Sequence, residues 1–151
     1  MAFSAGHTGI AGGQELDLKF EKKKKSLKKI IDMQKKKTGK LFSFCLNAVG
    51  MIAKKNLNEK KYLTKLGEDI GLLFQLADDF LDIKGSKLLT GKQIKKDKKK
   101  GKSTLIKLIG IEKTQHYANN LKKNILLKLK KHGKKAKELE ETIEFVLNRN
   151  F

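Results

Sequence analysis

The segment from Gly71 to Asp82 constrains the fold more than any other part of this chain. It reads GLLFQLADDFLD, and so places three carboxylates inside one of the most apolar stretches of a very basic sequence. A helix here would place four polar residues at positions i, i+3, i+4 and i+7, on one face: Gln75, Asp78, Asp79 and Asp82. The remaining positions are apolar around the rest of the helix. We therefore expect a helix buried among others, with only its acidic face toward something polar.

The ends of this helix are predicted from its flanking residues. Asn58 is a suitable N-cap, so we expect the helix to run from about Glu59, and Gly85 is a good residue at which to stop. The carboxylates would then occupy the last two turns, where the helix dipole disfavours negative charge. A cationic group is needed to offset them.

Three carboxylates at this spacing direct several hard oxygens toward one point. That arrangement suits Mg²⁺ bound partly through water and partly through a phosphate ligand. The alternative is a solvated polar face on an amphipathic helix, which is the commoner fate of acidic residues. We favour the metal and phosphate interpretation, because the flanking composition is that of a core helix and the next polar segment is rich in lysine.

Length and composition indicate one all-helical domain. The chain has 151 residues, no proline and no tryptophan, and its hydrophobic periodicity runs nearly from end to end. A net charge of +20 would ordinarily indicate nucleic acid, an anionic membrane surface or a phosphorylated substrate. Among 36 basic residues, however, only Arg149 is an arginine, whereas groove readers and phosphate clamps favour the bidentate arginine side chain. Most lysine runs are therefore expected to be solvated surface.

Cysteine usage and hydropathy predict a location in the cell. Cys45 is the single cysteine and lies in the apolar run LFSFCL, so we expect a small core residue, no disulfide framework and a reducing compartment. No stretch approaches the ~20 apolar residues of a membrane span, and the N-terminus lacks a signal-peptide pattern. We expect a soluble, cytoplasmic protein.

Two further segments carry chemistry. Lys37-Thr38-Gly39 lies where two helical pieces are expected to meet at a bend, and its ammonium and hydroxyl groups suit phosphate. Residues 85–103 form a polar, lysine-rich segment that includes Lys92 and Lys102. Its end resembles a phosphate-binding P-loop, but Lys96 stands where that motif needs glycine and no strand precedes it. A basic loop that meets a diphosphate and a simple solvated loop remain equally supported.

The remaining segments are predicted to be helical. Glycines at three-residue spacing between Gly6 and Gly13 are better explained by close helix packing than by a phosphate loop, because no strand precedes them. From Thr104 we expect helices as far as about His132, a break at Gly133, and a last helix over residues 135–147.

Five short motifs, in order and at similar spacing, resemble those of the trans-isoprenyl diphosphate synthases, the polyprenyl synthetase family that includes farnesyl and geranylgeranyl diphosphate synthases. The motifs are Ala11-Gly12-Gly13-Gln14 with Asp17, Lys37-Thr38-Gly39, Phe74-Gln75 with Asp78-Asp79-Phe80-Leu81-Asp82, Gly91-Lys92, and Gly101-Lys102-Ser103. Each is weak alone. Together they extend the resemblance over essentially the whole chain.

The resemblance implies a helical bundle around a deep cavity, in which Mg²⁺ ions link two aspartate-rich motifs to an allylic diphosphate. Ionisation gives an allylic carbocation, which the double bond of isopentenyl diphosphate attacks before a proton is lost. In this chain Asp78, Asp79 and Asp82 would be the metal ligands of the second motif, with Asp78 the foremost direct ligand. Lys37, Lys92 and Lys102 would hold the allylic diphosphate, while Thr38 and Gln75 would line the cavity and steady the cation.

The chain departs from the family in lacking the first aspartate-rich motif and the basic residues upstream of it that bind isopentenyl diphosphate. Met1 falls in the middle of the family domain. We therefore expect residues 1–151 to be a single partial domain, the C-terminal half of an isoprenoid-synthase bundle. Such a chain is expected to be inactive alone, and to self-associate or bind its missing half. The alternatives are a non-catalytic subunit of a two-chain prenyltransferase and a basic helical nucleic-acid-binding protein, although nucleic acid is disfavoured by the scarcity of arginine.

Overall fold

The computed structural model describes residues 1–21, 23–89 and 104–148, with the backbone alone for 84–89 and 148. Within those ranges every regular element is helical, which confirms the all-α prediction. The α-helices are α1 (Ala2–Ala5), α2 (Ile10–Phe20), α3 (Leu27–Gln34), α4 (Lys40–Ile52), α5 (Leu57–Leu89), α6 (Leu105–Ile109), α7 (Ile111–Leu129) and α8 (Lys137–Asn148). A π-helix, Lys35–Gly39, joins α3 to α4, and a 3-10 helix, Lys130–Ala136, joins α7 to α8.

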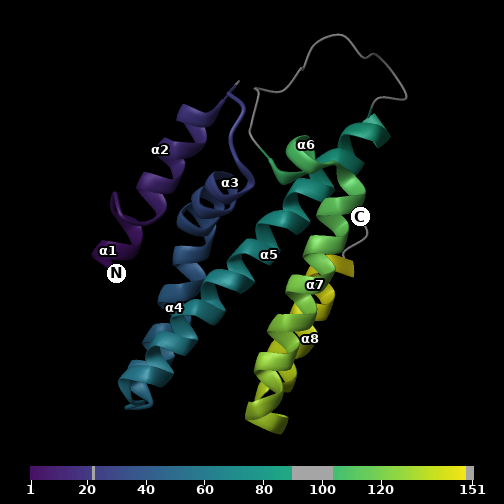
Figure 1. The fold of residues 1–151 in the computed structure, drawn as a ribbon. Coiled ribbons are helices and arrows are strands. Elements are labelled where there is room, and N and C mark those ends of the chain that lie inside the picture. Colours follow the sequence, from purple (N-terminus) through teal and green to yellow (C-terminus); the bar gives the residue numbers. More distant parts are fainter. Residues whose placement is uncertain (22, 90–103, 149–151) are drawn as a thin grey trace.

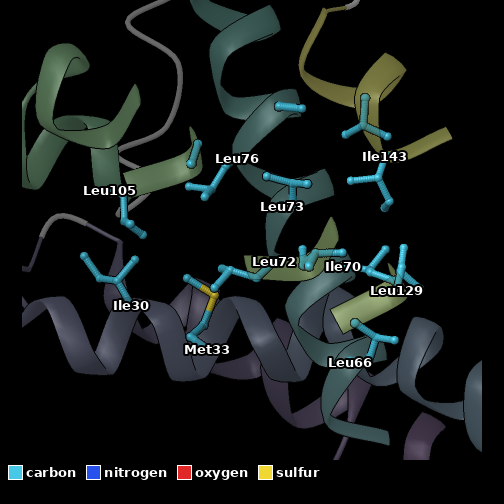
Figure 2. Close-up of a cluster of buried hydrophobic side chains, with 14 of the residues drawn as sticks. Ile30, Met33, Leu66, Ile70, Leu72, Leu73, Leu76, Leu105, Leu129 and Ile143 are labelled. Carbon is cyan, nitrogen blue, oxygen red and sulfur yellow. The ribbon is translucent and has the colours of Figure 1, made fainter. Parts of the chain in front are cut away.

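Helix α5 is the central element of the fold. On one side of it lies the continuous helix formed by α3, the π-helix and α4 (residues 27–52, the α3–α4 rod), and on the other side lies the α7–α8 pair (Figure 1). Its side chains Leu72, Leu73 and Leu76 are wholly buried. Figure 2 shows them among residues of the surrounding helices, namely Ile30, Met33, Leu105, Leu129 and Ile143. The expected burial of this helix is confirmed for Leu72, Leu73, Leu76 and Ala77, whereas the other apolar positions of the segment are only half-buried: Phe74, Phe80, Leu81 and Ile83.

Glycines let α5 approach the α3–α4 rod at backbone distance. A Cβ added to Gly71 would lie 2.6 Å from the Cα of Gly39, and one added to Gly67 would lie 2.5 Å from the Cα of Ser43. No side chain other than hydrogen fits at either position. This contact brings the π-helix directly against the segment of α5 that precedes the aspartates.

Three local predictions were wrong. Helix α5 continues to Leu89 rather than ending near Gly85, because an interior glycine costs only about 1 kcal/mol relative to alanine. It begins at Leu57 rather than about Glu59, and the cap is Asn56 rather than Asn58: the Oδ1 of Asn56 accepts a hydrogen bond from the backbone N of Glu59 at 2.9 Å. Cys45 is exposed, because the opposite side of α4 packs on α5.

The glycine break after α7 lies close to the predicted place. Gly133 has φ of +57°, in the left-handed region that favours glycine, but α7 already ends at Leu129 and the 3-10 helix carries the chain past it. No helix within the described residues is long and apolar enough to cross a membrane.

Candidate functional site

The four polar residues of α5 form a gradient of exposure. Asp79 is 9% exposed, Gln75 and Asp78 are half-buried, and Asp82 is exposed. The face that carries them therefore has a buried carboxylate near its middle and an exposed one at its C-terminal end. Because α5 continues to Leu89, these carboxylates lie farther from the helix end than the sequence predicted.

A chain of hydrogen bonds joins the π-helix to this face. The hydroxyl of Thr38 donates to Oε1 of Gln75 at 2.9 Å, and Nε2 of Gln75 donates to Oδ1 of Asp79 at 3.2 Å. Three of the residues singled out from the sequence are thus brought into one network. The close contact of Gly39 with Gly71 places their two segments side by side.

Gln34 is a member of this network that the sequence analysis did not identify. Its Nε2 donates to Oδ2 of Asp79 at 3.1 Å, and the residue is 3% exposed. A signal was present, since Gln34 falls one position after Met33 and four after Ile30, on the apolar side of a helix. A glutamine there needs a polar partner in the interior.

Burial strongly perturbs Asp79. Loss of solvent raises the pKa of this carboxyl to about 6, and the negative charges of Asp82 and Asp78 act in the same direction. The hydrogen bonds from Gln75 and Gln34 oppose that rise. A cation beside these carboxylates would favour their ionised forms, so the site is electrostatically suited to a metal ion.

Lys37 reaches a carboxylate on a different helix. Its Nζ pairs with Oδ2 of Asp17 on α2 at 2.5 Å, and Asp17 is 7% exposed. Helix α2 fits closely there, because a Cβ added to Gly13 would lie 2.2 Å from the backbone N of Lys37. The other two lysines predicted to hold diphosphate, Lys92 and Lys102, lie outside the described residues.

A buried carboxylate with two partly exposed lysines fixes the start of the π-helix. Asp69 on α5 is 7% exposed and accepts from Lys35 at 3.1 Å and from Lys128 of α7 at 2.7 Å. The cluster joins the π-helix, α5 and α7, and nothing in the sequence pattern indicated it. A π-turn inside an α-helix is rare and is frequently found at functional sites. Here it lies between Gln34 and the α4 helix and carries both Lys37 and Thr38.

The carboxylates do not make a complete metal site by themselves. Among the side chains that the structure describes, no group of three or more His, Cys, Asp or Glu residues is arranged to hold a metal ion. Mg²⁺ is usually held by one or two carboxylates together with waters and substrate phosphates. The residues present fit that mode of binding, in which a diphosphate supplies the remaining ligands.

A cavity of about 640 Å³ borders the same π-helix but is lined by other residues. Its walls carry two carboxylates among several lysines and apolar groups: Thr8, Leu16, Phe20, Lys29, Asp32, Lys35, Lys36, Lys40 and Glu68. None of the site residues predicted from the sequence lines it.

Solved structures share this fold. A farnesyl/geranylfarnesyl diphosphate synthase (FPP/GFPP synthase) from Zymomonas mobilis matches with a TM-score of 0.80 and 32% identity, over 96% of this chain and 48% of that one. A geranyltransferase from Helicobacter pylori, solved with magnesium and isoprenyl diphosphate, matches with a TM-score of 0.75 and 30% identity, over 97% of this chain and 48% of that one. The fold is that of the isoprenoid synthases.

Sequence comparison gives the family. The model of the polyprenyl synthetase family matches residues 2–144, and the chain belongs to this family. The farnesyl diphosphate synthase of Haemophilus influenzae is 37% identical over 87% of this chain and 45% of its own length. That of Bacillus subtilis is 32% identical over 90% of this chain and 42% of its own. The chain spans about half the length of the relatives it matches.

Proposed function

We propose that this chain provides the allylic-diphosphate half of a Mg²⁺-dependent prenyltransferase, which joins isopentenyl diphosphate to an allylic diphosphate to make a short-chain isoprenyl diphosphate of farnesyl or geranylgeranyl type. The observation that carries the proposal is the hydrogen-bond network of Thr38, Gln75 and Asp79 in a chain of this family. The network lies on the face of α5 that carries Gln75, Asp78, Asp79 and Asp82, called here the aspartate face. The aspartates of this site suit a metal ion, its lysines suit phosphate, and the oxygen atoms of Thr38 and Gln75 suit a carbocation.

Each group has a role in the proposed reaction. Asp78, Asp79 and Asp82 hold Mg²⁺, and Lys37, Lys92 and Lys102 hold the allylic diphosphate. Bound Mg²⁺ supplies positive charge that stabilises the departing diphosphate. Thr38 and Gln75 line the substrate cavity, and the partial negative charges of their oxygen atoms steady the allylic cation. Lys37 can keep its contact with Asp17 while it donates to phosphate, since an ammonium group has three N–H donors.

We propose further that the 151-residue chain is a partial domain and does not turn over substrate alone. Its sequence contains one aspartate-rich motif, at residues 78–82, and no second one. Large apolar side chains on α4 are exposed, among them Leu41 at 49%, Val49 at 57% and Ile52 at 83%. These support association with a second copy or with a chain that carries the other half of the fold. Turnover of both diphosphates by the isolated chain would contradict this part of the proposal.

The test is a calorimetric titration of the purified chain with a non-hydrolysable allylic diphosphate analogue, with and without Mg²⁺. We expect binding that needs Mg²⁺ and that is lost in the double variant Asp78→Asn, Asp82→Asn. The matched control is Glu140→Gln, Glu144→Gln, which removes the same charge from α8. Binding that ignores both the metal and the aspartates, and falls steeply with salt, would instead support a general polyanion-binding protein.

A further inference from the structure

We propose that Gln34 is a positioning residue of the aspartate-rich motif: its side-chain amide holds the Asp79 carboxylate in one orientation, and thereby sets the affinity for Mg²⁺ and diphosphate without touching either. This inference rests on the proposed function. It assigns a role to a residue that the motifs of the sequence do not include.

The geometry makes Asp79 a carboxylate held from two sides. One oxygen accepts from Gln75, four residues earlier on the same helix, at 3.2 Å. The other accepts from Gln34, at the end of α3, at 3.1 Å. The last torsion of an aspartate side chain is soft, so a single hydrogen bond leaves the carboxylate free to turn about its Cβ–Cγ bond. The two bonds together fix its plane, and Gln34 supplies the one that comes from another helix.

The second observation is that Gln34 is poorly placed for stability alone. It is 3% exposed, and its Oε1 is buried with no hydrogen-bond partner among the residues described. A buried acceptor without a partner disfavours folding. A methionine of similar length and shape would fill the same space and remove that unpaired oxygen. A methionine lacks the N–H that donates to Asp79. We therefore attribute the presence of glutamine at position 34 to its hydrogen bond with Asp79.

The effect on metal binding follows from the chemistry of carboxylate ligands. Residues that hydrogen-bond to a metal ligand fix its orientation, and losing one typically costs about 10–100-fold in metal affinity. The same network continues through Gln75 to Thr38. Loss of the Gln34 bond therefore loosens the deep end of the site, while every residue proposed to contact Mg²⁺ or diphosphate remains present.

The experiment measures Mg²⁺ affinity and stability on the same samples. The full chain is titrated with Mg²⁺ in the presence of inorganic diphosphate by calorimetry, and thermal unfolding is followed by circular dichroism without metal. We expect Gln34→Met to weaken the apparent Mg²⁺ affinity by about 10–100-fold. The variant should still unfold cooperatively without metal, at a Tm lowered by the loss of one hydrogen bond to the buried Asp79. The control Gln115→Met makes the same change on the exposed side of α7, and should alter neither quantity.

Three results would overturn the inference. The first is an unchanged Mg²⁺ affinity in Gln34→Met. The second is a variant that shows no cooperative unfolding transition without metal, because Gln34 would then be a structural residue. The third is a parent chain that binds no Mg²⁺ with diphosphate. That failure appears without any substitution, so it is assigned to the proposed function itself.

Discussion

At the scale of single residues, the aspartate face divides its carboxylates by environment. Asp79 is held by two amides in the interior, while Asp82 lies at the surface. The pKa of Asp79, raised to about 6, means that at neutral pH a buried negative charge is retained although it is unfavourable. The cost of that charge is a property of the metal-free chain, and substitution can measure it.

We expect Asp79→Asn to stabilise the metal-free chain at neutral pH. The folded-state pKa of Asp79, about 6, lies above the ordinary value of 3.8, so its contribution to stability is fully present below about pH 3.8 and is lost as the pH rises through 6. A shift of this size corresponds to roughly 2–3 kcal/mol. Asparagine carries no charge. Its amide N–H can donate to Oε1 of Gln34 if the Gln34 amide turns over, while its oxygen still accepts from Gln75.

Urea unfolding in a chelating buffer at pH 4 and at pH 7.5 would measure this effect. The variant should exceed the parent at pH 7.5 and lose most of that advantage at pH 4. A variant less stable than the parent at both values would contradict the expectation.

Thr38→Val removes the hydroxyl that donates to Gln75 and keeps the shape of the side chain. We expect a loss of about 1 kcal/mol in the free energy of unfolding, the usual net value of one hydrogen bond. The matched control is Thr142→Val, because Thr142 donates within an exposed turn of α8. Equal losses in the two variants would mean that the network of Thr38 adds nothing to stability.

At the scale of elements, the π-helix is the part that positions the site. Glycines bring it against α5, and the Asp69 cluster holds its first residue. Packing and ion pairs thus act on one short segment from two sides. Both can be tested by changes away from the proposed ligands.

Gly71→Ala should be destabilising. The new Cβ would lie 2.6 Å from the Cα of Gly39, so α5 and the π-helix would have to separate. Overpacking of this kind typically costs about 1–3 kcal/mol. Thermal unfolding would register it, and a Tm at or above the parent value would show that the helices can part without loss.

Asp69→Asn should also be destabilising, because Lys35 and Lys128 would face each other without the carboxylate between them. The side chains of Lys35 and Lys128 are 27% and 35% exposed, so solvent screens part of the effect, and we expect a loss of about 1–2 kcal/mol. The control Glu144→Gln removes the exposed partner of Lys122 and should change stability by less than about 0.5 kcal/mol. Equal losses would remove any special role for Asp69.

The sequence predicted the elements better than their details. The buried central helix followed from apolar residues around all but one face, and the resemblance in five motifs anticipated the family. The ends of that helix did not follow. Gly85 is tolerated inside it, and either Asn56 or Asn58 could have been the N-cap, of which the structure uses Asn56. Cys45 was misplaced because an apolar run does not say which of its sides meets the core.

Part of the candidate site was accessible from the sequence. Thr38, Gln75 and Asp79 were chosen by residue type and spacing, and the structure brings them together. Gln34 and Asp69 were not, because their partners lie 45 and 34 residues away in the chain and the π-turn changes the helical phase. Their pairing depends on tertiary packing alone.

At the scale of the whole molecule, the chain presents an apolar stripe on α4. Leu41, Cys45, Val49 and Ile52 follow one another at helical spacing and are all exposed. Solvent contact of a continuous stripe of this kind is unfavourable, and such stripes mark association surfaces. The cysteine in its middle provides a chemical probe.

We expect the purified chain to self-associate, with a mass by light scattering at least about twice its 17.1 kDa. The triple variant Leu41→Ser, Val49→Ser, Ile52→Ser should shift that mass toward the monomer, and the Cys45 thiol should react faster with a water-soluble thiol reagent as the protein is diluted. A compact monomer at all concentrations, with a dilution-independent thiol rate, would refute this.

The π-turn between α3 and α4 also sets how far α3 is rotated about the helix axis relative to α4. Each residue of an α-helix turns the chain by about 100°, and a π-turn accommodates one residue more than a regular turn would. Deleting a single residue such as Lys36 would let the rod close into ordinary α-helix with little change of phase, because it removes the residue that the π-turn accommodates. If the segment closed into ordinary α-helix with its full length kept, everything before it would swing by about that angle. Gln34 and the core residues Ile30 and Met33 would then face away from α5. The π winding of this one turn therefore decides whether the first half of the rod and the aspartate face meet at all.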